Sequence, residues 1–458
     1  MDLLILKGGT YAQLTLADNI QSEERWTPTL AVWSTLITKN GPNLEPFSMR
    51  IAKVINILGF YNNPIIKIKN VYFMKNNIHN ISADGLLRGK LNQAVNEKNI
   101  QDGKVIVQRP VAPLTVKVTL DEREQMMQGA IELTKQYGRY DNHLFIDTMH
   151  IHAHDIIPLR IKKILLHFAS DYSYEQYGAI VFKGLVEVDQ NVIGPTPESW
   201  QEYDHKIKCE FGFISALLHG IARSVPIKQY YQRGAKEYLH SLIPEKGQEN
   251  KQTGAGSEVE LMIHSEDPNL YSCADYITFL YLRNEERVKS MFYSIRSHDL
   301  MKEYVDKLFK PIFKFPLDAN FKPEEKIGCD KTEAILFGDT TLPFIRFDPA
   351  EQLFSVDVNQ SEEALSALIP FWEDVKDLIY LEFTPSAGDA VIVNNKLCCH
   401  ARGKFLAGYK INENGILVPC ERRIMVRMMS TANLMSFHPY TKTLNPYIGM
   451  EKHFGQLF

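Results

Sequence analysis

Apolar residues recur at every second position in short segments that lie far apart in the sequence. In residues 257–264, Val259, Leu261 and Ile263 alternate with other residues, which is the period of a strand. Alternation and short apolar runs predict strands over residues 178–183, 258–265, 276–283, 343–347 and 389–394. Because long connections separate these segments, we exclude a simple βαβ repeat and expect an antiparallel sandwich or barrel with helices packed outside it.

Three further segments carry helix signals. Thr119 and Glu122 have the spacing of a capping box and predict a helix start. One side of that helix should carry Met127, Ala130, Ile131 and Thr134. A second helix is predicted over residues 156–168, with Ile161, Leu165 and Phe168 inward. A third begins after Ser361 and should run to about residue 378, across Pro370.

The first 113 residues are predicted to form a separate α+β extension. Four apolar residues there have the spacing of one helix face: Ile51, Val54, Ile55 and Leu58. Ile66 and Ile68 alternate with lysines, as on a half-buried strand. Pro110 and Pro113 then interrupt the chain, so we place a boundary between a domain of residues 1–113 and a domain of residues 114–458.

Composition narrows the classes of function. The chain is 45% hydrophobic and 23% charged, as a globular protein is, and its formal net charge of −4 gives no reason to expect a nucleic-acid partner. Its six cysteines include no CxxC pair, which favours free thiols in a reducing compartment. No segment reaches the roughly 18 uninterrupted apolar residues of a membrane span. We therefore expect a cytoplasmic protein without a membrane partner.

A histidine and a glutamate stand two residues apart at the end of one predicted strand. Strand side chains repeat every two residues, so His264 and Glu266 should project to the same side. His400, which follows the apolar strand at residues 390–393, is the candidate for a third ligand. Two histidines and one carboxylate suit iron(II) and leave three positions for a bidentate 2-oxo acid and dioxygen. Taken alone, such a His–Glu pair is a weak signal, because such pairs occur by chance and an ordinary surface pair is the simpler explanation.

Two arginines, Arg423 and Arg427, lie four residues apart in an apolar segment shortly after His400. If this segment is a strand, both point to one face, and inward arginines are costly without anions. A dicarboxylate co-substrate would supply those anions, and the planar guanidinium binds carboxylate in a bidentate manner. A surface strand with salt-bridged arginines is the alternative. It is disfavoured by the apolar neighbours Ile424, Met425, Val426 and Met428.

From about residue 115 to 435 the chain resembles the clavaminate synthase group of iron and 2-oxoglutarate oxygenases, which includes asparagine oxygenase and arginine and lysine hydroxylases. It is more distantly similar to taurine dioxygenase. The resemblance rests on ordered blocks: residues 178–185, Pro195–Pro197, Gly254–Ser257, His264–Asp267, Tyr281–Asn284, Ile345–Asp348, Gly388–Asp389, His400–Arg402 and Arg423–Arg427. Several such blocks in one order are far more specific than the metal motif alone.

The resemblance implies a mainly β fold with flanking helices, a double-stranded β-helix (jelly roll) oxygenase core and an N-terminal α+β extension of unknown role. It implies an iron(II) and 2-oxoglutarate-dependent hydroxylase. Such an enzyme uses dioxygen to hydroxylate an unactivated C–H bond of an amino acid or an amino-acid-derived metabolite, with release of succinate and carbon dioxide. His264, Glu266 and His400 fall at the iron ligands. Arg423 falls where the family holds the distal carboxylate of 2-oxoglutarate, and Ser290 falls where a threonine usually shares it.

Substrate contacts follow less directly from the resemblance. Arg427 matches a second arginine that faces the active site, where it would hold a substrate carboxylate, with Glu266 facing the amino group, or support the near carboxylate of 2-oxoglutarate. Asp348 and Asp357 lie where an acidic residue would suit a basic side chain, although solvated surface positions are the alternative. The chain departs from the family by an insertion near residues 407–419 and by Gly254 in place of a serine.

Two other classes of function remain to be weighed. His150, His152 and His154, followed by Asp155, would serve as metal ligands in a zinc-dependent hydrolase, but they precede the predicted helix at residue 156 rather than a strand tip. A catalytically inactive oxygenase fold that acts as a binding module is the other alternative, and the retention of all three ligands and Arg423 argues against it. Cys398 and Cys399 are expected to be small packing residues.

Overall fold

The computed structural model describes residues 2–7, 10–15, 100–101, 104–105, 114–169, 178–199, 209–229, 238–268, 273–316, 332–355, 359–378, 381–433 and 447–448. The chain divides into two units, residues 1–81 and 82–458. In the first, β1 (Asp2–Lys7) and β2 (Thr10–Thr15) pair as an antiparallel hairpin. The predicted helix face at residues 51–58, the predicted strand at residues 66–68 and the boundary at residue 113 lie outside the described residues.

An eight-stranded sheet is the larger of the two main sheets that the structure describes in the second unit. Its order is β23 (Tyr447–Ile448), β7 (Val225–Gln229), β22 (Ile424–Thr431), β10 (Tyr276–Arg283), β18 (Ala390–Asn394), β6 (Ala179–Lys183) and β5 (Leu114–Lys117), and β8 (Leu239–Leu242) also pairs with β22. The pairs β5–β6 and β23–β7 are parallel, and the others are antiparallel. The sheet is therefore mixed, with β10 and β22 at its centre.

A four-stranded antiparallel sheet is the smaller one. Its order is β17 (Leu381–Phe383), β11 (Ser290–Ser294), β19 (Cys398–Arg402) and β9 (Leu261–His264). Side chains of the two sheets share one buried cluster, in which Phe279 and Val391 of the larger sheet lie with Phe292 and Cys398 of the smaller. The two sheets therefore pack face to face.

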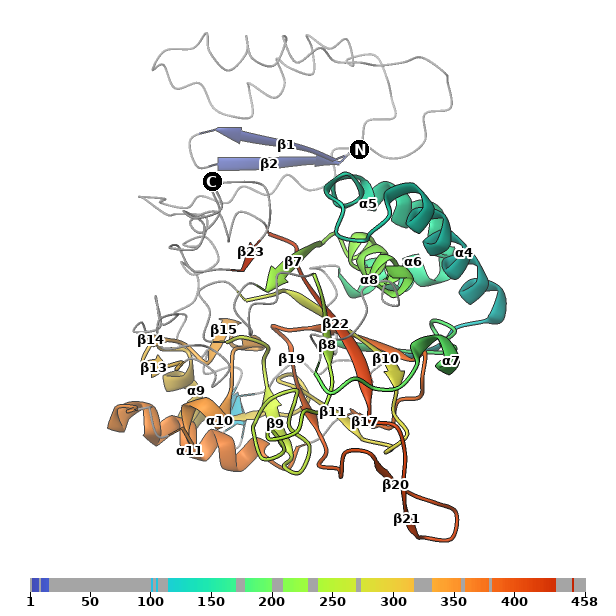
Figure 1. Ribbon diagram of the computed structural model, residues 1–458. Helices are drawn as coiled ribbons and strands as arrows, with labels where there is room; N and C mark the ends of the chain where they lie inside the picture. Colours follow the sequence, from blue (N-terminus) through green and yellow to red (C-terminus); the bar gives the residue numbers. More distant parts are fainter. Residues whose placement is uncertain are drawn as a thin grey trace, which may run out of the picture. The chain divides into compact units, whose positions relative to one another are not determined.

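Helices cover the outer face of each sheet (Figure 1). The larger sheet packs against α4 (Leu120–Tyr137), α5 (His143–Ile156), α6 (Leu159–Phe168) and α8 (Cys209–Ile221). The smaller sheet packs against α9 (Lys302–Leu308) and α11 (Glu362–Val375). Strand β10 is buried on both faces, so Leu280 and Leu282 join the helix-side core while Phe279 and Tyr281 join the core between the sheets. This two-sided burial explains its nearly continuous apolar sequence.

Short elements complete the second unit. These are α7 (Gln190–Ile193), α10 (Pro349–Gln352), the sheet of β12 (Leu300–Met301), β4 (Lys104–Val105) and β3 (Ile100–Gln101), and the pairs β13 (Phe313–Lys314) with β14 (Thr332–Glu333) and β15 (Leu336–Asp339) with β16 (Leu342–Ile345). The predicted insertion near residues 407–419 forms a hairpin of β20 (Tyr409–Ile411) and β21 (Leu417–Pro419) that projects away from both sheets (Figure 1).

Most predicted elements are confirmed, some with shifted ends. The strands predicted at residues 178–183, 276–283 and 389–394 match β6, β10 and β18 within one residue at either end. The strand predicted over residues 258–265 is shorter, because Ser257 and Glu258 donate their backbone N–H groups to Glu249 instead of to a neighbouring strand. The strand predicted at residues 343–347 lies at Leu342–Ile345, within the β15–β16 hairpin.

Two helix predictions need correction. The helix predicted over residues 156–168 begins only at Leu159, because Pro158 disfavours a helical conformation in the residue before it and separates α6 from α5. On α4 the buried face is formed by Met126, Ala130 and Leu133, whereas Ile131 is exposed. The predicted inward positions of α6 are confirmed, as is Ser361 as the cap of α11, which ends at Val375.

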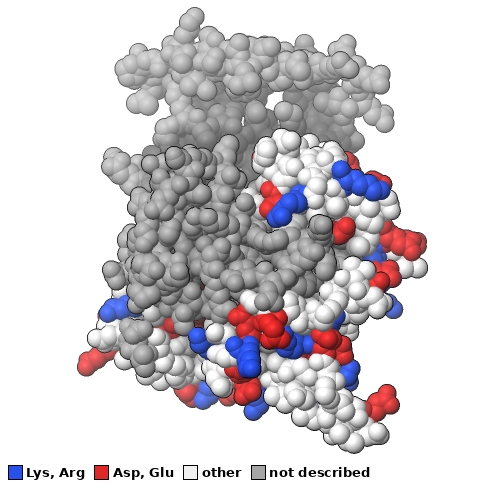
Figure 2. Space-filling model, viewed as in Figure 1, with Lys and Arg blue, Asp and Glu red and all other residues white. Residues whose placement is uncertain are grey.

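On the face drawn in Figure 2, acidic and basic side chains of the described residues lie among one another and do not gather into a patch of one sign. Within the described ranges, no helix is both long and apolar enough to span a bilayer.

The capping box of α4 provides a test of local stability. Thr119 Oγ1 accepts a hydrogen bond from Glu122 N at 3.3 Å, and the Glu122 carboxylate accepts one from Thr119 N at 3.0 Å. Because Thr119→Ala leaves a helix N–H without its partner, it should lower the free energy of unfolding by about 1 kcal/mol. Thr119→Ser keeps the hydroxyl group and should therefore retain most of the stabilisation. Urea denaturation of both variants measures this, and an unchanged midpoint for Thr119→Ala would show that the box does not stabilise α4.

Candidate active site

Two histidines meet at the edge of the smaller sheet. His264 is the last residue of β9, and His400 lies directly opposite it on β19. Their ring centroids are 4.3 Å apart. The Nδ1 of His264 lies 2.8 Å from the carbonyl oxygen of Met262. As a hydrogen-bond donor to that carbonyl, Nδ1 holds the proton of the neutral ring and leaves Nε2 as the atom with a lone pair to bind a ligand.

Glu266 lies two residues beyond the end of β9, and its position depends on a neighbouring asparagine. Glu266 N donates to Asn395 Oδ1 at 2.7 Å, and Asn395 Nδ2 donates to the carbonyl oxygen of Glu266 at 3.0 Å. The preceding Ser265 N donates to Phe347 O at 2.7 Å. These backbone contacts hold the turn after β9, so the Glu266 carboxylate faces the two histidines rather than solvent.

Ligand atoms of His264, Glu266 and His400 lie within 4.8 Å of one another, and across the described ranges this is the one group of its kind. Glu266 Oε2 is 3.4 Å from His400 Nε2. Burial and the neighbouring His264 lower the pKa of His400 to about 4, so its ring is neutral near pH 7. Two imidazoles and a carboxylate fit a divalent transition metal. The structure thus brings the three predicted ligands together.

Burial of Glu266 is balanced by positive charge. Burial alone would raise the pKa of this carboxyl, but Arg427, His400 and His264 together hold it below its usual value. Arg427 Nη1 contacts Glu266 Oε1, and both side chains are buried. Arg427 thus reaches the predicted cavity, and Glu266 is its partner there. The two oxygens of Glu266 face different groups: Oε1 faces Arg427 and Oε2 faces His400.

A second corner of the pocket holds a cation without a carboxylate partner. The buried Arg423 donates from Nη2 to Met425 Sδ at 2.9 Å, and its guanidinium carbon lies 5.8 Å from the ring centroid of Tyr281. Tyr281 Oη and Ser290 Oγ are 2.9 Å apart beside it. Among the described residues no carboxylate contacts this guanidinium, and burial lowers the pKa of Arg423. Such a corner favours an anionic ligand.

All predicted site residues that the structure describes line one pocket: His264, Glu266, Ser290, Asp348, His400, Arg423 and Arg427. Asp348 is half-buried, and burial raises its pKa. Its carboxylate caps α10 by accepting a hydrogen bond from Glu351 N at 3.3 Å. Gly254 lines the same pocket. Asp357 lies outside the described residues. Cys398 and Cys399 are buried packing residues, as predicted.

Sequence reasoning missed several pocket residues. Arg402 lines the pocket two residues after His400 on β19, and the period of the strand was a usable signal for it. Tyr281 lies opposite Arg423 and pairs with Ser290. Asp267 and Glu351 add two carboxylates. Asn395 had no local signal, because its contact with Glu266 joins residues 129 positions apart.

The histidine cluster proposed for a zinc hydrolase lies inside α5, not before a helix. His150 Nδ1 lies 3.0 Å from Gly220 O, His152 Nε2 lies 2.8 Å from Tyr137 Oη, and His154 is exposed. Residues two apart on a helix point in different directions. These three histidines therefore do not converge on one point, and the structure gives the hydrolase alternative no support.

The chain closely resembles two curated proteins, although no family model matches it. It is 46% identical over 349 residues to the L-lysine 4-hydroxylase of Chitinophaga pinensis, a match that covers 76% of this chain and 91% of that protein. It is 47% identical over 349 residues to the L-lysine 4-hydroxylase of Niastella koreensis, covering 76% and 94%. The similarity thus spans nearly all of both relatives.

Solved structures share the architecture. The non-heme iron oxygenase OrfP in complex with Fe, succinate and (3S)-hydroxy-L-Arg matches with a TM-score of 0.63 at 21% identity, over 73% of this chain and 99% of that chain. The same oxygenase with Fe and alpha-ketoglutaric acid matches with a TM-score of 0.59 at 23% identity, over 73% and 100%. At these identities the likeness shows the fold.

Removal of one histidine tests the metal site. His264→Ala and His400→Ala should fold but lose affinity for a divalent metal by more than the roughly 10- to 100-fold that follows loss of a residue behind the ligands. Anaerobic titration with Fe(II), or titration with Mn(II), measures this. His154→Ala is the matched control and should bind metal as the unaltered chain does. Retention of metal by both site variants, or loss in the control, would contradict the assignment.

Proposed function

The chain belongs to the L-lysine 4-hydroxylase family and is an iron(II)- and 2-oxoglutarate-dependent amino-acid hydroxylase, and from that premise we propose that it hydroxylates free L-lysine at carbon 4. The observation that carries the proposal is the pocket in which His264, Glu266 and His400 meet beside Arg423 and Arg427. The complete ligand group and the unneutralised Arg423 argue against an inactive binding module.

The domain and fold assignments are part of the proposal. The two facing sheets are the two halves of a double-stranded β-helix, or jelly roll, and residues 114–458 form the oxygenase domain. The support is that the match to OrfP covers nearly the whole of that chain and that every pocket residue lies within residues 114–458. Residues 1–113 form an extension, to which we assign no role.

His264, Glu266 and His400 hold the iron in this proposal. Iron(II) bound there would activate dioxygen, so that 2-oxoglutarate is oxidised to succinate and carbon dioxide and the substrate gains one oxygen atom. The chain's own residues position the reactants. Arg427 holds the Oε1 of Glu266, which directs Oε2 toward the histidines. The buried ring of Phe279, 5.0 Å from that of His400 between centroids, helps exclude water from this side.

Arg423 binds the distal carboxylate of 2-oxoglutarate. Two observations support this role: the Arg423 side chain is buried without a carboxylate partner among the described residues, and the hydroxyl groups of Tyr281 and Ser290 lie beside it. Ser290 Oγ would donate to the carboxylate while Tyr281 Oη donates to Ser290, so the buried tyrosine fixes the direction of the serine hydroxyl. This pair gives Ser290 the fixed orientation that a free serine side chain lacks.

Charge in the pocket favours a basic substrate. Among the described residues that line it, four are carboxylates (Glu266, Asp267, Asp348 and Glu351) and three are arginines (Arg402, Arg423 and Arg427), which leaves one net negative charge. Iron(II) and the 2-oxoglutarate dianion cancel each other. A substrate with one net positive charge, such as lysine, would complete neutrality, whereas a neutral amino acid would leave a negative charge buried.

The head and tail of lysine would meet different residues. Arg427 and Glu266 are placed to meet the α-carboxylate and the α-ammonium group, although Arg427 beside the near carboxylate of 2-oxoglutarate remains the alternative. Asp348, half-buried in the same pocket, would receive the ε-ammonium group.

The reaction requires no nucleic acid and no membrane, and the cytoplasmic location stays a prediction.

Arg423→Ala tests the co-substrate contact. A charge-assisted hydrogen bond of this kind contributes about 1.5–3 kcal/mol, so the 2-oxoglutarate Kd should rise on the order of 10- to 150-fold. The 2-oxoglutarate Kd of Arg423→Lys should lie between those of the unaltered chain and Arg423→Ala, because an ammonium group keeps the charge but lacks the planar fork. Calorimetric titration with 2-oxoglutarate in the presence of Mn(II) measures both, and metal affinity should stay within about twofold. An unaltered 2-oxoglutarate Kd in Arg423→Ala would remove this role.

A small panel of amino acids tests the substrate. With iron(II), 2-oxoglutarate and ascorbate, L-lysine should stimulate succinate formation and gain one oxygen atom, at carbon 4 by NMR. L-Norleucine, which ends in a methyl group instead of the ε-ammonium group, should be a far poorer substrate. Asp348→Asn keeps the helix cap but removes the charge, and it should lower kcat/KM for lysine about 10- to 150-fold while leaving norleucine nearly unchanged.

The panel also contains the outcomes that would refute the proposal. Equal turnover of lysine and norleucine would mean that the ε-ammonium group is not recognised. Loss of activity toward both lysine and norleucine in Asp348→Asn would mean that Asp348 does not act on the ε-ammonium group. Glu351→Gln then tests whether the neighbouring carboxylate does. Silence with all free amino acids, from protein that binds metal and 2-oxoglutarate, would overturn the free-amino-acid proposal.

A further inference from the structure

Arg423 lies just outside the larger sheet, directly before the first residue of a strand. It is the residue before β22, whose first ladder pair with β10 joins Ile424 to Arg283. The insertion that forms the β20–β21 hairpin ends only a few residues earlier, at Pro419. The strand ladder therefore does not itself hold the backbone of Arg423, and a flexible start of β22 would leave the guanidinium poorly placed.

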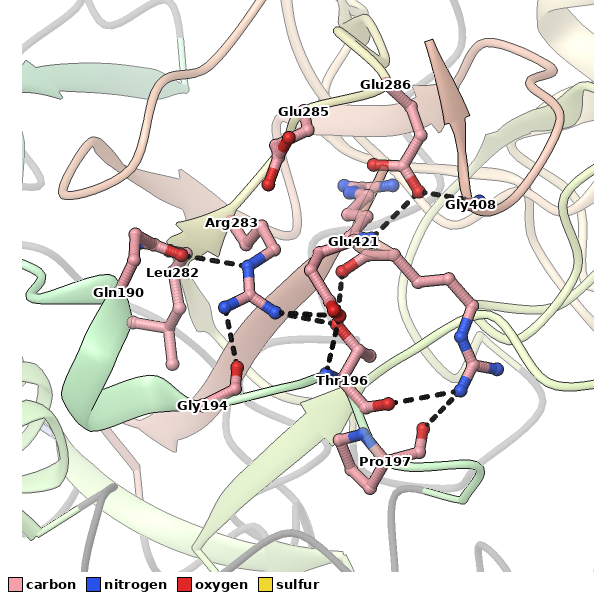
Figure 3. Close-up of polar contacts among 12 residues, drawn as sticks. Gln190, Gly194, Thr196, Pro197, Leu282, Arg283, Glu285, Glu286, Gly408 and Glu421 are labelled. Carbon is pink, nitrogen blue, oxygen red and sulfur yellow. Dashed lines mark hydrogen bonds and ion pairs between the residues drawn. The ribbon is translucent and has the colours of Figure 1, made fainter. Parts of the chain in front are cut away.

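One carboxylate oxygen replaces the missing ladder contact. Glu286 Oε1 accepts a hydrogen bond from Arg423 N at 2.9 Å and a second from Gly408 N at 3.3 Å. Gly408 O in turn accepts Cys420 N at 2.8 Å. The two ends of the insertion are thus joined at their base, and Glu286 connects that base to the residue that carries the guanidinium. Figure 3 shows the contact between Glu286 and Gly408.

The residues just before Arg423 are fixed by a different set of contacts. Thr196 N donates to Glu421 Oε2 at 2.9 Å, and Thr196 Oγ1 donates to Arg422 O at 2.6 Å. The buried Arg283 donates from Nη1 to Thr196 Oγ1 at 2.9 Å and from Nη2 to Gly194 O at 2.7 Å (Figure 3). These contacts anchor Glu421 and Arg422 to the 194–198 loop. The contact on Arg423 N itself is left to Glu286.

The environment of Glu286 favours a positioning role over an ordinary surface contact. Its Oε2 is buried and has no hydrogen-bond partner in the part of the chain that the structure describes. An unpartnered carboxylate oxygen is unfavourable, so the side chain is held where its other oxygen is needed. Burial raises the pKa of Glu286, in keeping with this placement. The adjacent Glu285, in contrast, forms a partly exposed ion pair with Lys410 at 2.6 Å.

We propose that Glu286 is a positioning residue for 2-oxoglutarate: by holding Arg423 N and the base of the β20–β21 hairpin with one oxygen, it sets where the Arg423 guanidinium meets the distal carboxylate. The proposal rests on the role of Arg423 given above. It adds that affinity for the co-substrate depends on a residue outside the pocket, which touches neither iron nor either reactant.

Three variants separate this role from general structural support. Glu286→Met fills the same space without an acceptor, Glu286→Gln keeps Oε1, and Glu285→Ala removes the Lys410 ion pair from the same hairpin. Glu286→Met should raise the 2-oxoglutarate Kd and KM about 5- to 10-fold, less than Arg423→Ala because the guanidinium itself is kept, with kcat at saturating co-substrate, lysine KM and metal affinity within about twofold. Glu286→Gln and Glu285→Ala should match the unaltered chain.

The readouts are calorimetric 2-oxoglutarate titration with Mn(II), steady-state kinetics and the melting temperature. If Glu286→Met binds 2-oxoglutarate normally, or if Glu286→Gln is as impaired as Glu286→Met, the inference is overturned. Equal loss of kcat, metal affinity and melting temperature would also overturn it, since that pattern is general destabilisation. If Glu286→Met is insoluble, Glu286→Ala, which also lacks an acceptor, takes its place. Normal 2-oxoglutarate binding by Arg423→Ala refutes the proposed role of Arg423; normal binding by Glu286→Met alone refutes only the inference.

Discussion

The buried carboxylate of Glu266 is the constraint on which the arrangement of the site depends. A carboxylate that leaves water needs opposite charge and hydrogen bonds close by, or it takes up a proton. Here Arg427 contacts one oxygen and His400 lies near the other, so the group stays ionised and keeps one oxygen directed toward the histidines. The same charge makes the position suitable for a metal cation, because a divalent ion adds to the compensation that Arg427 begins.

The two-sheet architecture makes this compensation geometrically available. The smaller sheet supplies His264 and His400, while the larger sheet supplies Arg427, and Arg423 directly precedes the same strand. Because the sheets pack face to face, side chains from both reach one space without any long loop. Helices cover the outer faces, so the strands between them are buried on both sides. Strands therefore hold His264, His400 and Arg427 in the site.

The sequence predicted those parts of the site that follow a local period. His264 and Glu266 are two apart, and Arg423 and Arg427 are four apart, so the period of a strand predicts that each pair shares one side. Both pairs do line one pocket, although Glu266 and Arg423 lie just outside β9 and β22. Contacts between distant residues leave no such local trace. Asn395 and Glu266 lie 129 positions apart, and Glu286 and Arg423 lie 137 apart. A core of packed sheets with helices outside it was predictable for the same reason, although two parallel strand pairs make the larger sheet mixed rather than antiparallel. The break at Pro158 was missed, although the residue itself signals it.

A second cation explains why the corner around Arg423 suits a carboxylate so well. Arg402 is buried on β19 and donates only to backbone carbonyls, those of Ser257, Val259 and Gly403. Burial and the neighbouring Arg423 lower its pKa to about 9. Two close guanidinium groups that no carboxylate contacts, among the described residues, repel each other. An anion that binds between or beside them relieves that repulsion in addition to forming its own hydrogen bonds. The corner therefore gains more from a carboxylate than a single exposed arginine would, whereas a neutral group of the same shape would accept hydrogen bonds without relieving the repulsion.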